Sequence, residues 1–182
     1  MKKIYVFLMA LCCFLHVKAQ QVFTTRHGQI SFFSRTPMEN IDALNNEVAS
    51  AFNMQTGEIG FAVLIKSFHF ERALMEEHFN ENYMESDKMP KAGFKGKINN
   101  ITSVDFTKDG SYNVTAEGEM TIHGVAKKIA VPGTIIVKGG LPQVIVKFKL
   151  APKEYNIQIP SLVADKIAGS MNVSVDCRYE KK

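Results

Sequence analysis

Few residues of this chain have the types and spacing that catalysis needs. His123 is the strongest candidate, because strict strand alternation places Glu119 and Thr121 on its face, and a histidine beside a carboxylate is a typical general base or metal ligand. No Ser or Cys occupies a nucleophile elbow, and Cys177 falls on an apolar strand face. We therefore expect a structural role for His123, with a hydrogen bond to the turn at Gly124–Val125.

A second cluster of ionisable residues surrounds His78. Glu76, Glu77 and His78 do not have the HExxH spacing of a zinc site, and His69 lies nine residues upstream. Clusters of this kind are usually solvated helix faces. We expect no metal ion and no catalytic residue here.

Two cations near this segment could contact an anionic ligand head group. They are Lys66 and Arg72, and Phe68 and Phe70 lie between them as core or mouth residues. A lone Lys or Arg at a strand end is usually only solvated. The sequence leaves both interpretations open.

The first nineteen residues have the features of a secretory signal peptide. Lys2 and Lys3 precede an apolar run too short to span a bilayer, and Ala19 ends a small-residue cleavage site before Gln20. We therefore predict that residues 1–19 are removed. The mature protein is then expected to be periplasmic or secreted.

Removal of the leader changes the charge and the cysteine content. The chain has 22 basic and 18 acidic residues, and loss of three leader lysines leaves 19 basic ones, so the formal charge falls from +4 to +1. No basic tract of the nucleic-acid-binding kind remains, and no further apolar run reaches transmembrane length. Cys12 follows Leu11, where a lipid-attachment motif has a small residue, so no lipid attachment is expected. Cys177 is then the one cysteine left, and residues 20–182 must fold as one domain without an internal disulfide.

Short runs with period-two alternation dominate the rest of the sequence. The clearest is residues 111–122, and the pattern recurs over residues 93–98, 143–150 and 170–181. Each run has one polar face, which suits a closed antiparallel barrel with solvent outside. We predict an all-β fold, a barrel of about eight strands.

Three segments depart from this rhythm. Residues 71–84 combine helix formers with apolar i, i+4 spacing before Pro90, which predicts a helical segment. Residues 35–47 fit either a short helix or an irregular extended stretch. Residues 26–29, with the sequence RHGQ, are typical of a turn between two strands.

Small residues interrupt the apolar faces of two predicted strands. Gly96, Ala116 and Gly118 are flanked there by aromatic and methionine side chains. Either large side chains from the far wall fill the space beside them, or the barrel encloses a cavity. The candidate cavity-lining residues are those on the inward strand faces: Phe61, Val63, Phe70, Phe94, Gly96, Tyr112, Val114, Ala116, Gly118, Met120, Ile122, Val144, Val146, Phe148, Val173 and Val175.

Two motifs give the chain a resemblance to the YceI-like family. The first is a Y-M-x-S/T-x-x-x-P-x-x-x-F-x-G pattern, matched here by Tyr83, Met84, Ser86, Pro90, Phe94 and Gly96. The second is G-x-L-T-I-H-G-V-T, matched by Gly118, Thr121, Ile122, His123, Gly124 and Val125. The resemblance extends over roughly residues 21–180.

This resemblance implies an extended, lipocalin-like barrel with helical segments near its mouth, in a secreted or periplasmic protein. It also implies an elongated apolar cavity that holds a polyisoprenoid chain. Such a tail forms no hydrogen bonds, so an apolar wall suits it, and each buried CH2 contributes about 0.8 kcal/mol before ordering costs.

We therefore expect noncatalytic binding of a lipid-like, isoprenoid-type molecule, for carriage, sequestration or a stress role. No cofactor is expected other than such a bound lipid, and the protein is expected to be a monomer or dimer. The alternative is a structural or interaction module whose barrel is filled and holds no small molecule.

Overall fold

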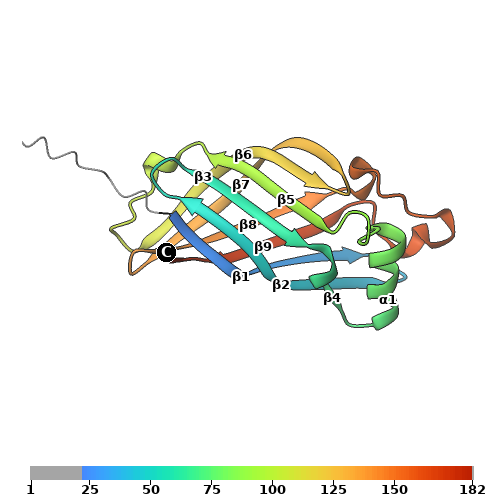
Figure 1. Cartoon of the computed structure of the whole chain (residues 1–182). Coiled ribbons are helices and arrows are strands. Elements are labelled where there is room, and N and C mark those ends of the chain that lie inside the picture. Colours follow the sequence, from blue (N-terminus) through green and yellow to red (C-terminus); the bar gives the residue numbers. More distant parts are fainter. Residues whose placement is uncertain (1–21, 182) are drawn as a thin grey trace, which may run out of the picture.

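The computed structural model describes residues 22–181, which contain ten β-strands and one α-helix. Eight of the strands form a closed antiparallel ring in the order β1-β9-β8-β7-β6-β5-β3-β2, which pairing of β1 with β2 completes (Figure 1). The ring strands are β1 (Val22–Arg35), β2 (Asn40–Asn53), β3 (Glu58–Leu64), β5 (Lys91–Ile98), β6 (Gly110–Ile122), β7 (Val125–Lys138), β8 (Leu141–Leu150) and β9 (Met171–Arg178). The predicted barrel of about eight strands is confirmed.

The remaining elements lie at the two ends of the ring. The short strands β4 (His69–Phe70) and β10 (Glu180–Lys181) add to β2 and β1. The helix α1 (Ala73–His78) continues into a π-helical turn, η2 (Phe79–Tyr83), which confirms the predicted helical segment. Four 3-10 turns complete the described residues: η1 (Ile65–Ser67), η3 (Ile101–Ser103), η4 (Pro152–Tyr155) and η5 (Ser161–Lys166). The predicted signal peptide, residues 1–19, lies outside the described residues.

The predicted turn at residues 26–29 is wrong, because β1 continues through it. The register of β1 against β2 shifts on both sides of Gly28, which marks a β-bulge. A Cβ atom added at Gly28 would lie only 2.4 Å from the Cys177 Sγ. The glycine is therefore needed for close packing of β1 against β9, not for a reversal of the chain.

Residues 35–47 are neither a helix nor irregular. The Thr36 N–H donates to the Glu39 carbonyl at 3.0 Å, and this tight turn leads directly into β2 at Asn40. The alternative of a short helix is therefore wrong. The segment is extended, as the other alternative predicted, but it forms a regular turn and strand instead of an irregular stretch. The turn brings Glu39 to one end of the barrel.

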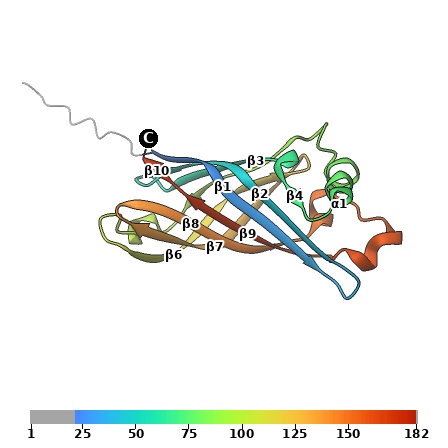
Figure 2. The ribbon, with the colours of Figure 1, turned by 90° about the horizontal axis from the view of Figure 1, so that it is seen from below.

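The two ends of the barrel differ in what covers them. At one end, named here the mouth end, lie α1, the β1–β2 turn and the segment of η5; the described chain starts and ends at the other, the closed end (Figures 1 and 2). Side chains fill the closed end: Phe52 and Ile135 are fully buried, and the Phe52 ring centroid lies 6.0 Å from that of Phe106 and 5.9 Å from that of Tyr179.

A buried hydrogen-bond chain fixes the closed end. The Ser50 Oγ lies 2.8 Å from the Gly60 carbonyl oxygen and 2.7 Å from the Tyr179 hydroxyl. Because the carbonyl can only accept, Ser50 donates to it, and the Tyr179 hydroxyl donates to Ser50. Burial raises the pKa of Tyr179. This chain ties β2 and β3 to the segment that follows β9.

Candidate ligand-binding cavity

A cavity of about 510 Å³ occupies the barrel from its middle to the mouth end. This volume is in the range of small-molecule sites, roughly 300–1,000 Å³. All eight ring strands contribute to the wall, and towards the closed end it is formed by Ile98, Val114 and Val144. At the mouth end the wall includes exposed side chains of Arg72 and Leu74.

Most of the predicted lining residues meet in this wall. Thirteen of them line the cavity: Phe61, Val63, Phe70, Phe94, Val114, Ala116, Met120, Ile122, Val144, Val146, Phe148, Val173 and Val175. Gly96, Gly118 and Tyr112 do not. The Tyr112 hydroxyl instead donates to the carbonyls of Asp105 or Lys108, each 3.1 Å away, in the loop before β6.

Close packing between β5 and β6 explains the two glycines, because an added Cβ atom would lie 2.4 Å from the Glu117 carbonyl oxygen at Gly96 and 2.3 Å from the Lys95 carbonyl oxygen at Gly118. Gly96 and Gly118 are paired across β5 and β6, and the added Cβ atom would also lie 2.5 Å from the Phe94 Cζ at Gly96 and 2.8 Å from it at Gly118. The ring therefore packs over both glycines and itself borders the cavity. Close packing applies at the glycines, whereas the neighbouring Ala116 borders open space.

Sequence reasoning predicted Phe70 and named Phe68 as a core or mouth residue, but it missed Phe32 and Phe79 of the same aromatic group towards the mouth. The Phe79 ring centroid lies 5.5 Å from that of Phe32, 5.7 Å from that of Phe68 and 5.0 Å from that of Phe70. All four rings border the cavity. Alternation of Ile30 and Phe32 could have revealed the β1 side of this wall, but Phe79 comes from the π-helical turn, which has no strand pattern.

A third part of the wall comes from the chain between β8 and β9. Ile157, Ile159, Val163 and Ile167 border the cavity from this segment, which contains η4 and η5. Irregular segments carry no periodic signal that would assign these side chains to the interior.

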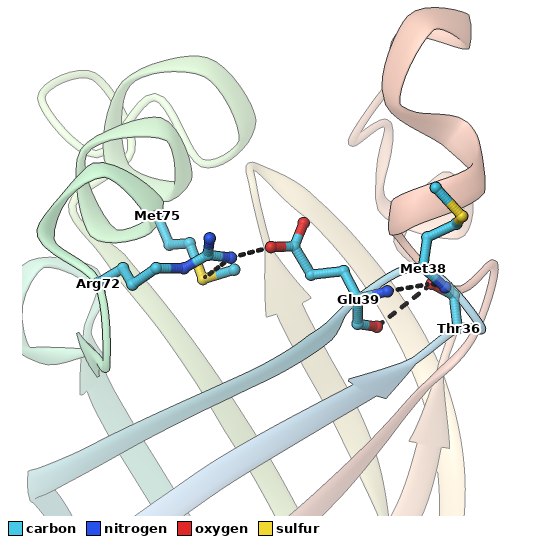
Figure 3. A network of polar contacts seen from close by, with 5 residues as sticks. All are labelled: Thr36, Met38, Glu39, Arg72 and Met75. Atoms are coloured by element: carbon cyan, nitrogen blue, oxygen red, sulfur yellow. Dashed lines mark hydrogen bonds and ion pairs between the residues drawn. The ribbon is translucent and has the colours of Figure 1, made fainter.

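Five lining residues have polar or charged side chains: Glu39, Arg72, His78, Tyr83 and Lys166. The Arg72 Nη2 donates to the Glu39 Oε1 and lies 3.6 Å from the Met75 Sδ (Figure 3). Thr36 holds the Glu39 backbone, because its Oγ1 accepts from the Glu39 N–H at 3.0 Å. Burial raises the pKa of Tyr83.

The two cations singled out from the sequence have different positions. Arg72 borders the cavity, whereas the Lys66 Nζ forms a surface ion pair with the Asp87 Oδ1 at 2.6 Å. Lys66 is not part of the cavity wall. Only Arg72 of this pair is placed to meet a ligand.

His123 links three segments, and its predicted hydrogen bond to the following turn is wrong. Its Nδ1 lies 3.3 Å from the Tyr155 carbonyl oxygen and its Nε2 3.3 Å from the Glu85 Oε2. With Gly124 it forms the positive-φ turn between β6 and β7, so it does not share a strand face with Glu119. The Lys88 ammonium lowers the pKa of Glu85 below its ordinary value, and His123 lowers it to a smaller extent.

The other candidate groups do not converge on a reactive site. His78 is hydrogen-bonded to Asn82 at 2.9 Å, and His69 lies 3.5 Å from Glu76. Within residues 22–181, no three His, Cys, Asp or Glu side chains come together as metal ligands. Burial raises the pKa of the Cys177 thiol to about 12, and this thiol lies outside the cavity wall.

A YceI-like domain model matches residues 16–178 of the sequence. The chain belongs to the YceI-like family. Both family motifs lie around the cavity: Tyr83, Met84, Phe94 and Ile122 line it, and His123 closes the adjacent turn. No helix of the described residues is long and apolar enough to cross a membrane.

Solved structures share this fold at low sequence identity. A polyisoprenoid-binding domain from Saccharophagus degradans is 11% identical with a TM-score of 0.76, over 90% of this chain and 99% of that one. BcnA from Burkholderia cenocepacia is 13% identical with a TM-score of 0.68, over 82% and 94%. The YCEI protein of Campylobacter jejuni is 16% identical with a TM-score of 0.56, over the whole of both chains. No curated protein sequence matches the chain.

Proposed function

We propose that this protein binds a lipid-like, isoprenoid-type molecule in the barrel cavity and does not transform it. The observation that carries the proposal is the cavity of about 510 Å³ with an almost entirely apolar wall. The similar fold of the Saccharophagus degradans domain, which is named for polyisoprenoid binding, supports it. The cavity also weighs against the alternative of a filled barrel with no ligand.

The physical basis is burial of the hydrocarbon tail. Each CH2 group transferred from water contributes about 0.8 kcal/mol, so ten of them contribute roughly 8 kcal/mol before the tail loses its conformational freedom. Aromatic and branched side chains such as Phe61, Phe148 and Val146 offer the tail contact without polar partners. Tight binding therefore needs no hydrogen bond within the barrel.

The environment of the ionisable residues supports a noncatalytic role. Both ring nitrogens of His123 are engaged by protein groups, and the high pKa of Cys177 keeps its thiol protonated. Together with the predicted signal peptide, this role would make the protein a lipid carrier or lipid store in the periplasm or outside the cell.

Mass spectrometry of an organic extract of the purified native protein tests this function. We expect isoprenoid masses that are absent from an extract of the same protein after delipidation. The delipidated protein should then bind a fluorescent isoprenoid. Val146→Phe should bind it more weakly, because the larger side chain narrows the cavity. Lys147→Phe is the matched control, because residue 147 faces outward. Failure to find bound lipid together with failure to bind the fluorescent probe would contradict the proposal.

A further inference from the structure

The charged residues of the cavity wall all lie at one end of it. Glu39 ends the β1–β2 turn, Arg72 directly precedes α1, His78 is the last residue of α1, and Lys166 ends η5. All of these segments are at the mouth end (Figures 1 and 2). A ligand with a polar head and an apolar tail can therefore place its head only there.

Positive charge exceeds negative charge in this part of the wall. Glu39 is its single carboxylate, whereas Arg72 and Lys166 are two cations. Glu76 on α1 is not part of the wall, because its carboxylate accepts from the Phe70 N–H at 3.2 Å and faces His69. Among the ion pairs of residues 22–181, none involves Lys166.

Arg72 retains unused hydrogen-bonding capacity. A guanidinium has five N–H donors, and Arg72 uses its Nη2 towards Glu39 and the weakly accepting Met75 sulfur (Figure 3). Its side chain is 59% exposed, whereas that of Glu39 is 24% exposed. The donors are therefore within reach of a group arriving at the mouth.

We propose that Arg72 selects ligands with an anionic, phosphate-type head group, and that Glu39 holds the guanidinium in the empty barrel. This inference rests on the proposed function. Carboxylate and phosphate oxygens present similar acceptors to a guanidinium, so the head group replaces Glu39 as the partner of Arg72. Lys166 contributes a second positive charge from the end of η5.

Glu39 makes this selection stricter. A neutral head group, such as an alcohol, forms a hydrogen bond that is too weak to displace a carboxylate from the guanidinium. Arg72 therefore stays paired with Glu39 and adds nothing to binding. An anionic head group restores a charge-assisted bond after the exchange. Tail burial is the same for both ligands, so the head alone decides between them.

Two lipids with the same tail test the proposal on the delipidated full chain. Geranylgeranyl diphosphate has the anionic head and geranylgeraniol the neutral one. We expect the diphosphate to bind about tenfold more tightly at low salt, as is typical of hydrogen bonds to charged groups. The preference should shrink as salt is added, because exposed charges are screened.

Single substitutions then assign the preference to residues. Arg72→Gln should remove it by weakening diphosphate binding about tenfold, and Glu39→Gln should strengthen diphosphate binding by freeing Arg72. Lys66→Gln is the matched control, because Lys66 is a nearby cation outside the wall. Lys66→Gln should bind both lipids like the wild type, and the head-group preference of each variant is the ratio of its two affinities. Circular dichroism shows whether the Arg72 and Glu39 variants are folded.

Each result has a distinct consequence. Equal wild-type binding of both lipids, or a preference that survives Arg72→Gln, overturns the role of Arg72 and leaves the proposed function intact. A weaker diphosphate complex in Glu39→Gln overturns the exchange, even if Arg72→Gln fails to fold. Binding of neither lipid by the wild type overturns the proposed function and the inference with it.

Discussion

The closed end and the mouth end of the barrel are made by the same eight strands but differ in how their interiors are used. At the closed end, Phe52, Ile135 and Val137 are at most 1% exposed and lie outside the cavity wall. At the mouth end, residues on the same strands, such as Phe148 and Met120, border open space. Backbone pairing thus closes the ring of eight strands, and side-chain size decides where its interior is hollow.

This division separates stability from binding along one axis. Side chains at the closed end lose contacts in every direction when they are truncated. Side chains of the mouth half already lack partners on the side facing the cavity. Substitutions should therefore unfold the protein at one end and change its ligand at the other.

The largest expected difference between the ends comes from removing one aromatic ring. Phe52→Ala should lower the free energy of unfolding by about 3–5 kcal/mol, because the fully buried ring leaves a cavity among Phe106 and Tyr179. Phe148→Ala should cost clearly less, since its ring already borders the cavity. Urea unfolding measures both. Equal losses would contradict the division of the barrel.

The next largest effect is expected at neighbouring positions on β6. Gly118→Ala should cost about 1–3 kcal/mol, because its Cβ would lie 2.3 Å from the Lys95 carbonyl oxygen and 2.5 Å from the Gly96 Cα, which are backbone atoms. Ala116→Leu should cost less, because its larger side chain enters the cavity.

The same pair separates packing from ligand binding. Ala116→Leu should weaken binding of a fluorescent isoprenoid, and Thr115→Leu, outside the cavity wall, is the control. Thermal melting of the delipidated proteins gives the stability of each variant. A large loss of stability in Ala116→Leu with unaltered binding would show that no ligand passes this position.

His123 should show a smaller effect at the mouth end. His123→Ala should lower the free energy of unfolding by about 1–2 kcal/mol, because it leaves the Tyr155 carbonyl without its donor. Binding per folded molecule should not change. His123→Asn should lose less, since asparagine tolerates the positive φ of this turn. Unchanged stability with lost conversion of a lipid would contradict the structural role.

The last expected effect is confined to alkaline solution and to the closed end. Burial raises the pKa of Cys177 from 9.0 to about 12, so the thiol stabilises the fold fully below pH 9. As the pH rises from 9 towards 12, the unfolded chain loses a proton that the native chain keeps, and the native state loses stability.

Cys177→Ala should therefore make the decline above pH 9 less steep. Some slope should remain, because the pKa of Tyr179 is also raised by burial. Unfolding free energies measured between about pH 8 and 11 give the two slopes. Identical slopes would show that the Cys177 thiol ionises in the native protein as it does in the unfolded one.

The barrel could be predicted because alternation is a local property of the chain. Residues 111–122 and 143–150 each show one apolar and one polar face within a single strand, and a closed antiparallel sheet follows from several such runs. The continuity of β1 through Gly28 could not be predicted. Pairing of β1 with β2 carries the strand through this residue, and the Cys177 Sγ that leaves room only for a glycine belongs to β9, which is distant in sequence.

The cavity wall likewise has a part that could be predicted from the sequence and a part that could not. Val114, Val146 and Val175 could be assigned to the interior because strand period fixes their side. Val163 and Phe79 could not, since the segments that hold them have no period. Nor could the sequence show that the Phe94 ring covers the two glycines, because ring orientation depends on contacts between strands.

Closure of the ring by β1 also determines when the protein can fold. β1 pairs with β2 early in the sequence, but its other neighbour is β9, with Gln29 opposite Asp176 and Phe33 opposite Asn172. During synthesis the growing chain therefore has two unpaired sheet edges until residues 172–176 are present. Such edges readily recruit strands of other chains, and pairing of distant strands is slow. The ring strand made last thus ends the period in which the newly made chain is prone to aggregation.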